Sequence, residues 1–132
     1  MIAKTEPLQN KLEELENSII DAALTVRKYW GAGLLDEIYR LSLIQELTNR
    51  GIKVRTQVPM PVKFDELTFE DAYRIDILVE DCVIIEVKPC CSKADLYKSH
   101  VSTYLKHSGY RLGFLLDYDA RQAKKCVNKI TP

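Results

Sequence analysis

The fold is decided by residues 73–89, which read YRIDILVEDCVIIEVKP. The odd-numbered strand positions of this stretch are β-branched, which is typical of pleated strands that bury one face. They are Ile75, Ile77, Val79, Val83, Ile85 and Val87. The even-numbered positions combine charged residues with the large apolar residues Leu78 and Ile84. The pattern predicts a hairpin whose charged face is partly covered, and we expect a helix to cover it.

The length of the turn decides which side chains of the hairpin share a face. A three-residue loop at 80–82 would set Asp76 opposite Glu86. Their Cβ atoms would then lie roughly 5 Å apart, and both carboxylates could bind one hard cation at about 2.1 Å. Lys88 follows Glu86 by two residues and points to the same side. These side chains suit metal-dependent hydrolysis of a phosphodiester, in which the ion polarises the phosphate and the ammonium orients a water.

A simpler interpretation accounts for the same spacing. Arg74 would lie opposite Lys88 in this register, so the four charged residues of the hairpin could form a network of cross-strand salt bridges. Glu-x-Lys is common in exposed strands. The hairpin alone therefore leaves both interpretations open.

Length and composition indicate a soluble globular protein. The 132 residues, 46% apolar and 29% charged, predict a single domain over 1–132. No apolar run reaches the roughly 18 residues of a membrane span, and the N-terminus does not resemble a signal peptide, so we expect a cytoplasmic protein without membrane contact. Four cysteines without CxxC spacing, and only two histidines, argue against zinc and against a disulfide framework.

The charges are unevenly distributed along the chain. Residues 1–81 contain 10 basic and 15 acidic residues, whereas residues 82–132 contain 9 basic and 4 acidic ones. The basic half could face a phosphate backbone or simply be a solvated surface. The net charge of zero argues against strong non-specific binding of nucleic acid by the monomer.

Two helices are predicted before the hairpin. Apolar residues at spacings of three and four run from Pro7 to Trp30, and the glycines of 31–33 end this helix. A second helix over 34–49 is apolar on most sides, so we expect it to be well buried. Tyr29, Trp30 and Tyr39 are expected in the core.

The remaining segments predict the rest of an α/β sheet. Residues 52–64 read as a strand, and its two prolines assign it to an edge or a bulge. Ser92 and Asp95 have the spacing of a capping box for a helix over 93–107. Residues 111–117 form a nearly continuous apolar run, typical of a strand buried on both faces, and a crossover through the helix would make this strand parallel to the second hairpin strand. Residues 120–132 could form a helix or an edge strand.

Further motifs surround the hairpin in the sequence. They are GAGLLDEIY at 31–39, Gln57-Val58-Pro59, Arg74-Ile75-Asp76, Ile84-Ile85-Glu86-Val87-Lys88, Thr103-Tyr104-Leu105-Lys106 and Leu112-Gly113-Phe114-Leu115-Leu116. In these motifs the chain resembles the PD-(D/E)XK nuclease superfamily and, within it, the GxxExxY family of bacterial and archaeal proteins. The resemblance implies a restriction-endonuclease-like α/β core, with a mixed sheet of four to five strands flanked by helices. Two N-terminal helices, three antiparallel strands, a crossover helix and a parallel strand would follow in that order.

The resemblance also implies a site. Mg²⁺, or Mn²⁺, would bind Asp76 and Glu86, and Lys88 would be the catalytic lysine. An auxiliary acid is implied at Asp36, where Glu is usual, with Glu37 beside it. The candidate substrate-binding residues are His100, Tyr104, Arg74 and Tyr39. The implied substrate is a nucleic acid, with DNA favoured over RNA.

The sequence departs from the family pattern at several positions. Besides Asp36, Arg27 and Tyr97 occupy usual His positions, and His100 stands where Gln is usual. These departures leave a second hypothesis open, a non-catalytic module of the same fold that binds nucleic acid or a protein partner. A third hypothesis is a homodimer formed through the strand that contains the prolines.

Overall fold

The structure, a computed structural model, describes residues 5–88 and 94–132. The elements are α1 (Thr5–Trp30), α2 (Asp36–Asn49), β1 (Val54–Phe64), β2 (Leu67–Val79), β3 (Val83–Val87), α3 (Ala94–Ser108), β4 (Leu112–Leu116), the 3₁₀ helix η2 (Ala123–Cys126) and β5 (Val127–Ile130). This order confirms the predicted one, and the undecided C-terminal segment forms η2 and β5. The predicted cap at Ser92 lies outside the described residues. Among the helices of the described part, none is long and apolar enough to cross a membrane.

The strands form one mixed sheet in the order β1-β2-β3-β4-β5. β1 pairs antiparallel with β2, and β2 pairs antiparallel with β3. β3 and β4, which are connected through α3, pair parallel, and β5 pairs antiparallel with β4. The predicted α/β fold with a mixed sheet of four to five strands is therefore confirmed. β1 lies at an edge, as its prolines predicted, and its pairing with β2 shifts between Met60 and Val62.

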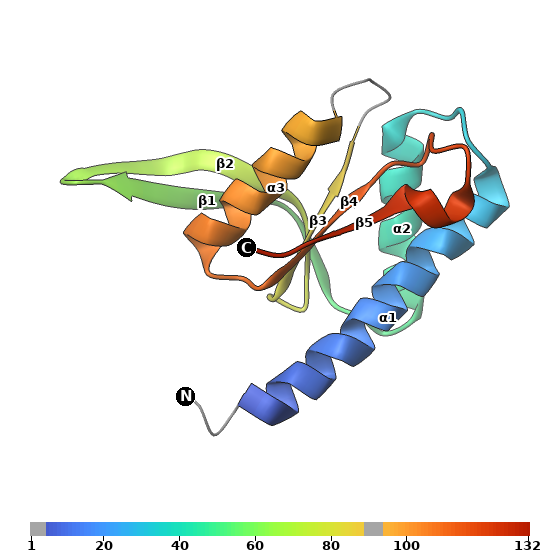
Figure 1. Ribbon diagram of the computed structural model, residues 1–132, viewed down its shortest axis with the longest axis horizontal. Coiled ribbons are helices and arrows are strands. Elements are labelled where there is room, and N and C mark those ends of the chain that lie inside the picture. The colour runs from blue at the N-terminus through green and yellow to red at the C-terminus, as the bar shows by residue number, and fades with distance from the viewer. Residues whose placement is uncertain (1–4, 89–93) are drawn as a thin grey trace.

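Helices pack on both faces of the sheet. α1 and α2 cover one face, and α3 covers the other (Figure 1). Val101 and Leu105 of α3 pack against Leu78 and Ile84. The helix that we expected to cover the charged face of the hairpin is therefore α3. The larger core lies under α1 and α2 and includes Ile77 and its odd-numbered neighbours on β2 and β3.

One residue of the hairpin lies on the opposite face from the one predicted. Ile75 was expected on the same face as Ile77, but it packs with Leu78 on the α3 side. The alternation changes at Asp76, where the neighbouring residue of β1, Gln57, has a φ of 50°. That value departs from extended strand geometry, and sequence alternation alone gives no sign of it.

The outer surfaces of the N-terminal helices are less buried than predicted. Tyr39 is buried, but Tyr29 and Trp30 are 78% and 44% exposed, so their assignment to the core was wrong. α2 begins at Asp36, and the prediction that it is well buried holds only for its inner side, which carries Tyr39, Leu43 and Leu47, since Leu41 is 57% exposed. In the described part of the chain each face of the sheet carries a single layer of helices, so no further helix covers the outer side of α2.

The outer ends of β1 and β2 form a two-stranded arm that projects from the rest of the molecule (Figure 1). Its turn lies at residues 65–66. Phe64, Leu67 and Phe69 near the tip are all more than half exposed. Nearer the core, the same strands carry Gln57, Arg74 and Asp76 of the candidate site.

Candidate functional site

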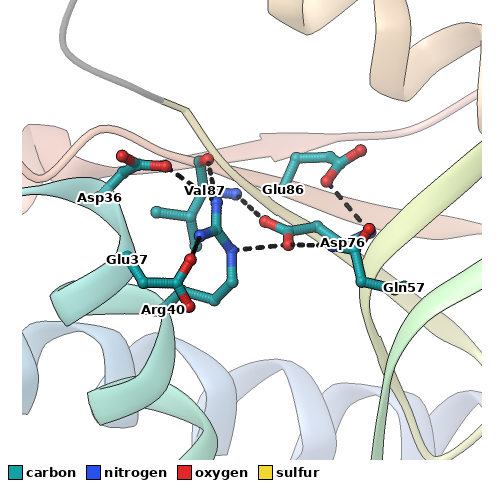
Figure 2. A network of polar contacts seen from close by, with 7 residues as sticks. All are labelled: Asp36, Glu37, Arg40, Gln57, Asp76, Glu86 and Val87. Atoms are coloured by element: carbon teal, nitrogen blue, oxygen red, sulfur yellow. Dashed lines mark hydrogen bonds and ion pairs between the residues drawn. The ribbon is translucent and has the colours of Figure 1, made fainter.

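Asp76 and Glu86 lie where β2 and β3 separate. The loop between these strands has three residues, as predicted, and the pairing of Ile77 with Ile85 sets Asp76 opposite Glu86. Beyond the pair of Ile77 and Ile85, the side-chain carboxylates accept hydrogen bonds from backbone N–H groups of the neighbouring strand. The Asp76 N–H donates to Glu86 Oε2 at 3.2 Å, and the Val87 N–H donates to Asp76 Oδ2 at 3.0 Å (Figure 2). Both acids are therefore fixed by backbone groups of the neighbouring strand.

A pocket of about 300 Å³ opens at this point. Its lining comes from α2, the three antiparallel strands, Lys88 and α3, and consists of Arg40, Gln57, Arg74, Asp76, Glu86, Val87, Lys88, Tyr97, His100 and Tyr104. Six candidate residues from the sequence meet here: Arg74, Asp76, Glu86, Lys88, His100 and Tyr104. The other three, Asp36, Glu37 and Tyr39, lie on α2 outside this lining.

Arg40 of α2 forms an ion pair with Asp76 in the pocket. Its Nε lies 2.6 Å from Asp76 Oδ1, and its Nη2 donates to the Val87 carbonyl at 3.3 Å. The same guanidinium donates to Asp36 at 3.0 Å and to Glu37 at 2.9 Å. Figure 2 shows Arg40 between the two acids of α2 and Asp76. Burial opposes the charge of Arg40, but the hydrogen bond and charge of Asp76, and then those of Asp36, raise its pKa.

Glu86 faces a different balance of charge. Burial, followed by the charge of Asp76, raises the pKa of Glu86 to about 8, although the Asp76 N–H and the charge of Arg40 act in the opposite direction. Two acids on adjacent strands thus share one guanidinium, which contacts Asp76. At neutral pH the metal-free pocket favours a protonated Glu86.

Lys88 lies at the border of two hollows. Its side chain is 3% exposed, and Nζ lies 3.5 Å from Asp117 Oδ1. Besides the acidic pocket, Lys88 lines a second hollow that also contains basic residues from α3 and the C-terminal segment. Those residues are Lys98, Arg121, Lys124 and Lys125. Lys88 therefore connects the carboxylates to a basic surface.

Ion pairs of the hairpin residues reach beyond the hairpin. Arg74 pairs with Asp71 at 2.8 Å, and Lys88 and Asp76 pair with Asp117 and Arg40. These partners come from α2, the outer part of β2 and the residue after β4. The charged residues are thus distributed around a pocket, and the simple cross-strand network does not describe these contacts.

Aromatic residues of α3 close one side of the pocket. The Tyr104 ring stacks on Tyr73 with centroids 4.1 Å apart, and the Tyr73 hydroxyl donates to the Tyr104 carbonyl at 3.2 Å. His100 lies next to Tyr104, with ring centroids 6.2 Å apart, and Tyr97 contacts His100 edge-on. His100 is exposed, so its ring is accessible to a ligand in the pocket.

Tyr39 occupies a different place from the other candidate residues. It is 1% exposed, and its ring stacks on Tyr118 with centroids 4.4 Å apart. Its hydroxyl donates to the Gly31 carbonyl at 2.6 Å and accepts the Leu34 N–H at 3.1 Å. These contacts hold the loop between α1 and α2, so this geometry gives Tyr39 no contact with a ligand in the pocket.

Sequence reasoning missed Arg40 and Gln57 as site residues. Arg40 follows Asp36 by four residues, the spacing of an ion pair on a helix, and that signal could have identified the pair. The contact of Arg40 with Asp76 joins segments that are distant in sequence, so no local spacing predicts it. The Gln57 amide donates to Asp76 Oδ1 at 3.2 Å, and its positive φ places strain at the site, as functional residues often do.

The oxygen donors of the pocket fit a hard divalent cation. Within residues 5–88 and 94–132 no group of three or more His, Cys, Asp or Glu side chains could hold a metal. Asp76 and Glu86 offer carboxylates and Val87 a carbonyl, and Arg40 contacts Asp76 Oδ1 through Nε and the Val87 oxygen through Nη2. Because Mg²⁺ retains several waters in proteins, two carboxylates are sufficient.

The fold and the pocket define a class of α/β protein in which carboxylates and a lysine from adjacent strand ends meet beside a crossover helix. The chain belongs to the PD-(D/E)XK nuclease superfamily, since the sequence model described by that name matches residues 13–130. No curated protein and no solved structure matches the chain.

Proposed function

We propose that the protein is a Mg²⁺-dependent nuclease of the GxxExxY family, with a single domain, that hydrolyses phosphodiester bonds of nucleic acids. One observation carries the proposal. In a chain of the PD-(D/E)XK nuclease superfamily, the three-residue loop between β2 and β3 brings Asp76, Glu86 and Lys88 to one pocket.

The proposed roles follow from the contacts of each residue. Asp76 and Glu86 would hold Mg²⁺ or Mn²⁺, which when bound would polarise the phosphate and acidify a water. Lys88, with its ammonium nearly excluded from solvent, would orient that water or stabilise charge that develops on the phosphate. Gln57 and the Val87 N–H hold the Asp76 carboxylate in position.

The substrate is proposed from the surroundings of Lys88. The basic hollow beside Lys88 would attract the phosphates of a nucleic acid strand whose scissile bond lies in the acidic pocket. Arg74 at the rim and His100 on α3 would contact neighbouring phosphates, and Tyr104 offers an aromatic face to a base or sugar. The preference for DNA over RNA stays a prediction.

A cleavage assay tests the proposal. Purified protein is incubated with labelled single- and double-stranded DNA and RNA in Mg²⁺, Mn²⁺ or EDTA. We expect cleavage that requires the metal and falls at least about 100-fold in Asp76→Asn and in Lys88→Met. Asp21→Asn is the matched control, because Asp21 pairs with Arg50 and lies outside the pocket lining. Cleavage that persists in Asp76→Asn and Lys88→Met would come from a contaminant and would overturn the assignment.

A second function is favoured by one contact. Because Arg40 already neutralises Asp76 at 2.6 Å, the pocket is able to exist without a metal, as a non-catalytic module that binds nucleic acid or a protein partner would require. Calorimetric titration with Mg²⁺ separates the two functions. A pure binding module takes up no metal at Asp76 and Glu86, and its affinity for nucleic acid is unchanged by EDTA.

A further inference from the structure

The guanidinium of Arg40 lies among oxygen atoms from α2, β2 and β3 (Figure 2). One of these, Asp76 Oδ1, belongs to a carboxylate that the proposed function assigns to a divalent cation, and the Val87 carbonyl oxygen is a further oxygen donor of the pocket. We propose that Arg40 holds the cation position in the metal-free protein and that a divalent cation binds by competing with Arg40 for Asp76. The competition presupposes the proposed cation site, but it does not presuppose cleavage.

The contacts of Asp76 leave little room for both cations. Oδ1 meets Arg40 Nε at 2.6 Å and Gln57 Nε2 at 3.2 Å, and Oδ2 accepts the Val87 N–H at 3.0 Å. Arg40 Nε and the Gln57 amide nitrogen therefore both lie against Oδ1. A metal ion at Oδ1 would therefore take the place of Arg40, and two cations held at one oxygen would repel each other.

Arg40 keeps partners when it leaves Asp76. Asp36 and Glu37 lie four and three residues before it on the same helix, and both already accept its hydrogen bonds. Their side chains are 34% and 61% exposed, compared with 8% for Asp76. Movement of the guanidinium toward solvent thus preserves two ion pairs while it frees Asp76. The acidic pair of α2 would serve as the alternative position of Arg40.

The contact that has to break is close but poorly aligned. Arg40 Nε lies 2.6 Å from Asp76 Oδ1, yet it is buried without an acceptor along its N–H bond. Strong arginine–carboxylate pairs are bidentate, with two parallel hydrogen bonds. The pair with Asp76 lacks that geometry, which favours its replacement by a divalent ion.

Metal affinity of matched variants tests the competition. Mn²⁺ binding to the EDTA-treated, dialysed full chain is measured by calorimetry for the wild type, Arg40→Gln and Arg50→Gln. We expect Arg40→Gln to bind Mn²⁺ at least about tenfold more tightly, which corresponds to about 1.4 kcal/mol. Arg50→Gln is the control, because Arg50 pairs with Glu46 and Asp21 away from the pocket, and its affinity is expected to equal that of the wild type.

A second measurement uses the wild-type chain and does not depend on how the variant folds. The NMR signal of the Arg40 Nε–H group is followed during titration with Mg²⁺, and we expect it to move as the guanidinium leaves Asp76. Equal or weaker Mn²⁺ binding by a folded Arg40→Gln, no Mn²⁺ binding by wild type and variant at millimolar concentration, or an Arg40 signal unmoved by saturating Mg²⁺ would each overturn the competition.

A double-mutant cycle distinguishes two roles for Asp36, as a partner of the displaced Arg40 or as a metal ligand. If Asp36 only holds the displaced Arg40, Asp36→Asn weakens Mn²⁺ binding in the wild type and has no effect in the Arg40→Gln background. Weaker binding in both backgrounds would make Asp36 a metal ligand and overturn this role.

Failure of the proposed nuclease function has a different signature. Tighter Mn²⁺ binding by Arg40→Gln without cleavage of any nucleic acid would support the competition and overturn the nuclease. Metal-dependent cleavage with unchanged Mn²⁺ affinity in Arg40→Gln would do the reverse.

Discussion

Substitution of Gly113 tests how α3 is positioned over the pocket. Gly113 lies on β4 beneath α3, and a Cβ atom added there would lie 2.7 Å from Val101 Cγ1. Carbon atoms in contact are normally about 3.5–4.0 Å apart. Val101 is fully buried, and a valine in a helix has one strongly preferred rotamer, so the side chain has no free space to enter. Gly113→Ala should therefore lift α3 from the sheet.

The magnitude follows from two opposing effects. Overpacking of a core costs about 1–3 kcal/mol, whereas replacing glycine at an ordinary strand position returns about 0.4–1 kcal/mol through the unfolded state. We expect Gly113→Ala to lower the free energy of unfolding by about 1–2 kcal/mol. Val101→Ala removes two buried methyl groups and should lower it by about 2 kcal/mol. In the double variant the added methyl enters space that Val101 has vacated, so the combined loss should be smaller than the sum by about 1 kcal/mol or more.

Urea denaturation followed by far-UV circular dichroism measures the three variants, with linear extrapolation to water. Independent sites add within about 0.5 kcal/mol. Additive losses at Gly113 and Val101, or a Gly113→Ala variant as stable as the wild type, would refute the close seating of α3 on β4. They would also remove the basis for placing Tyr97, His100 and Tyr104 at the pocket.

Three further predictions concern charge and thiol chemistry. Because the pKa of Glu86 is raised from 4.5 to about 8, its ionisation opposes folding as pH rises through that range. In EDTA the wild type should lose up to about 4 kcal/mol relative to Glu86→Gln between pH 5 and pH 9, and a difference independent of pH in urea titrations would contradict this. Burial raises the pKa of the Cys126 thiol to about 12, so iodoacetamide at pH 8 should label Cys126 only after unfolding. Mass spectrometry detects the label, and equal rates in folded and unfolded protein would argue against burial. Changing Lys124 and Lys125 together to Gln should weaken nucleic-acid binding for all sequences and reduce the salt slope by about 2; an unchanged slope in anisotropy titrations would exclude them as phosphate contacts.

The parts of the fold that follow from local pattern were predictable. Alternation along 73–89 and an odd-length loop determine the register of β2 and β3, and with it the position of Asp76 opposite Glu86. The continuous apolar run of β4 reflects burial on both faces, and two prolines are compatible only with an edge or bulge. Each of these features depends on residues close together in sequence and on a fixed period of side-chain direction.

Features that depend on packing between distant segments were not predictable in this way. The apolar residues of α2 indicate a helix, but they do not reveal that Leu41 has no layer above it. The family resemblance placed Tyr39 among the substrate-binding candidates, yet its hydroxyl donates to the Gly31 carbonyl in the loop before α2. The contact of Arg40 with Asp76 depends on the angle at which α2 crosses the sheet, which no local spacing encodes.

The geometry of the pocket also explains why an arginine would occupy it. Where β2 and β3 separate, the side chains of Asp76 and Glu86 accept hydrogen bonds from backbone N–H groups of the two strands. The sheet therefore requires both side chains to remain in place even without a ligand. Ionisation of Glu86 beside Asp76 would bring two like charges together, and their repulsion would oppose the pairing that positions both side chains. A guanidinium from α2 offsets the charge of Asp76 and also fastens α2 to the sheet through the Val87 carbonyl. Under the proposed competition, Arg40 is the group that stabilises this part of the fold while no divalent cation is bound.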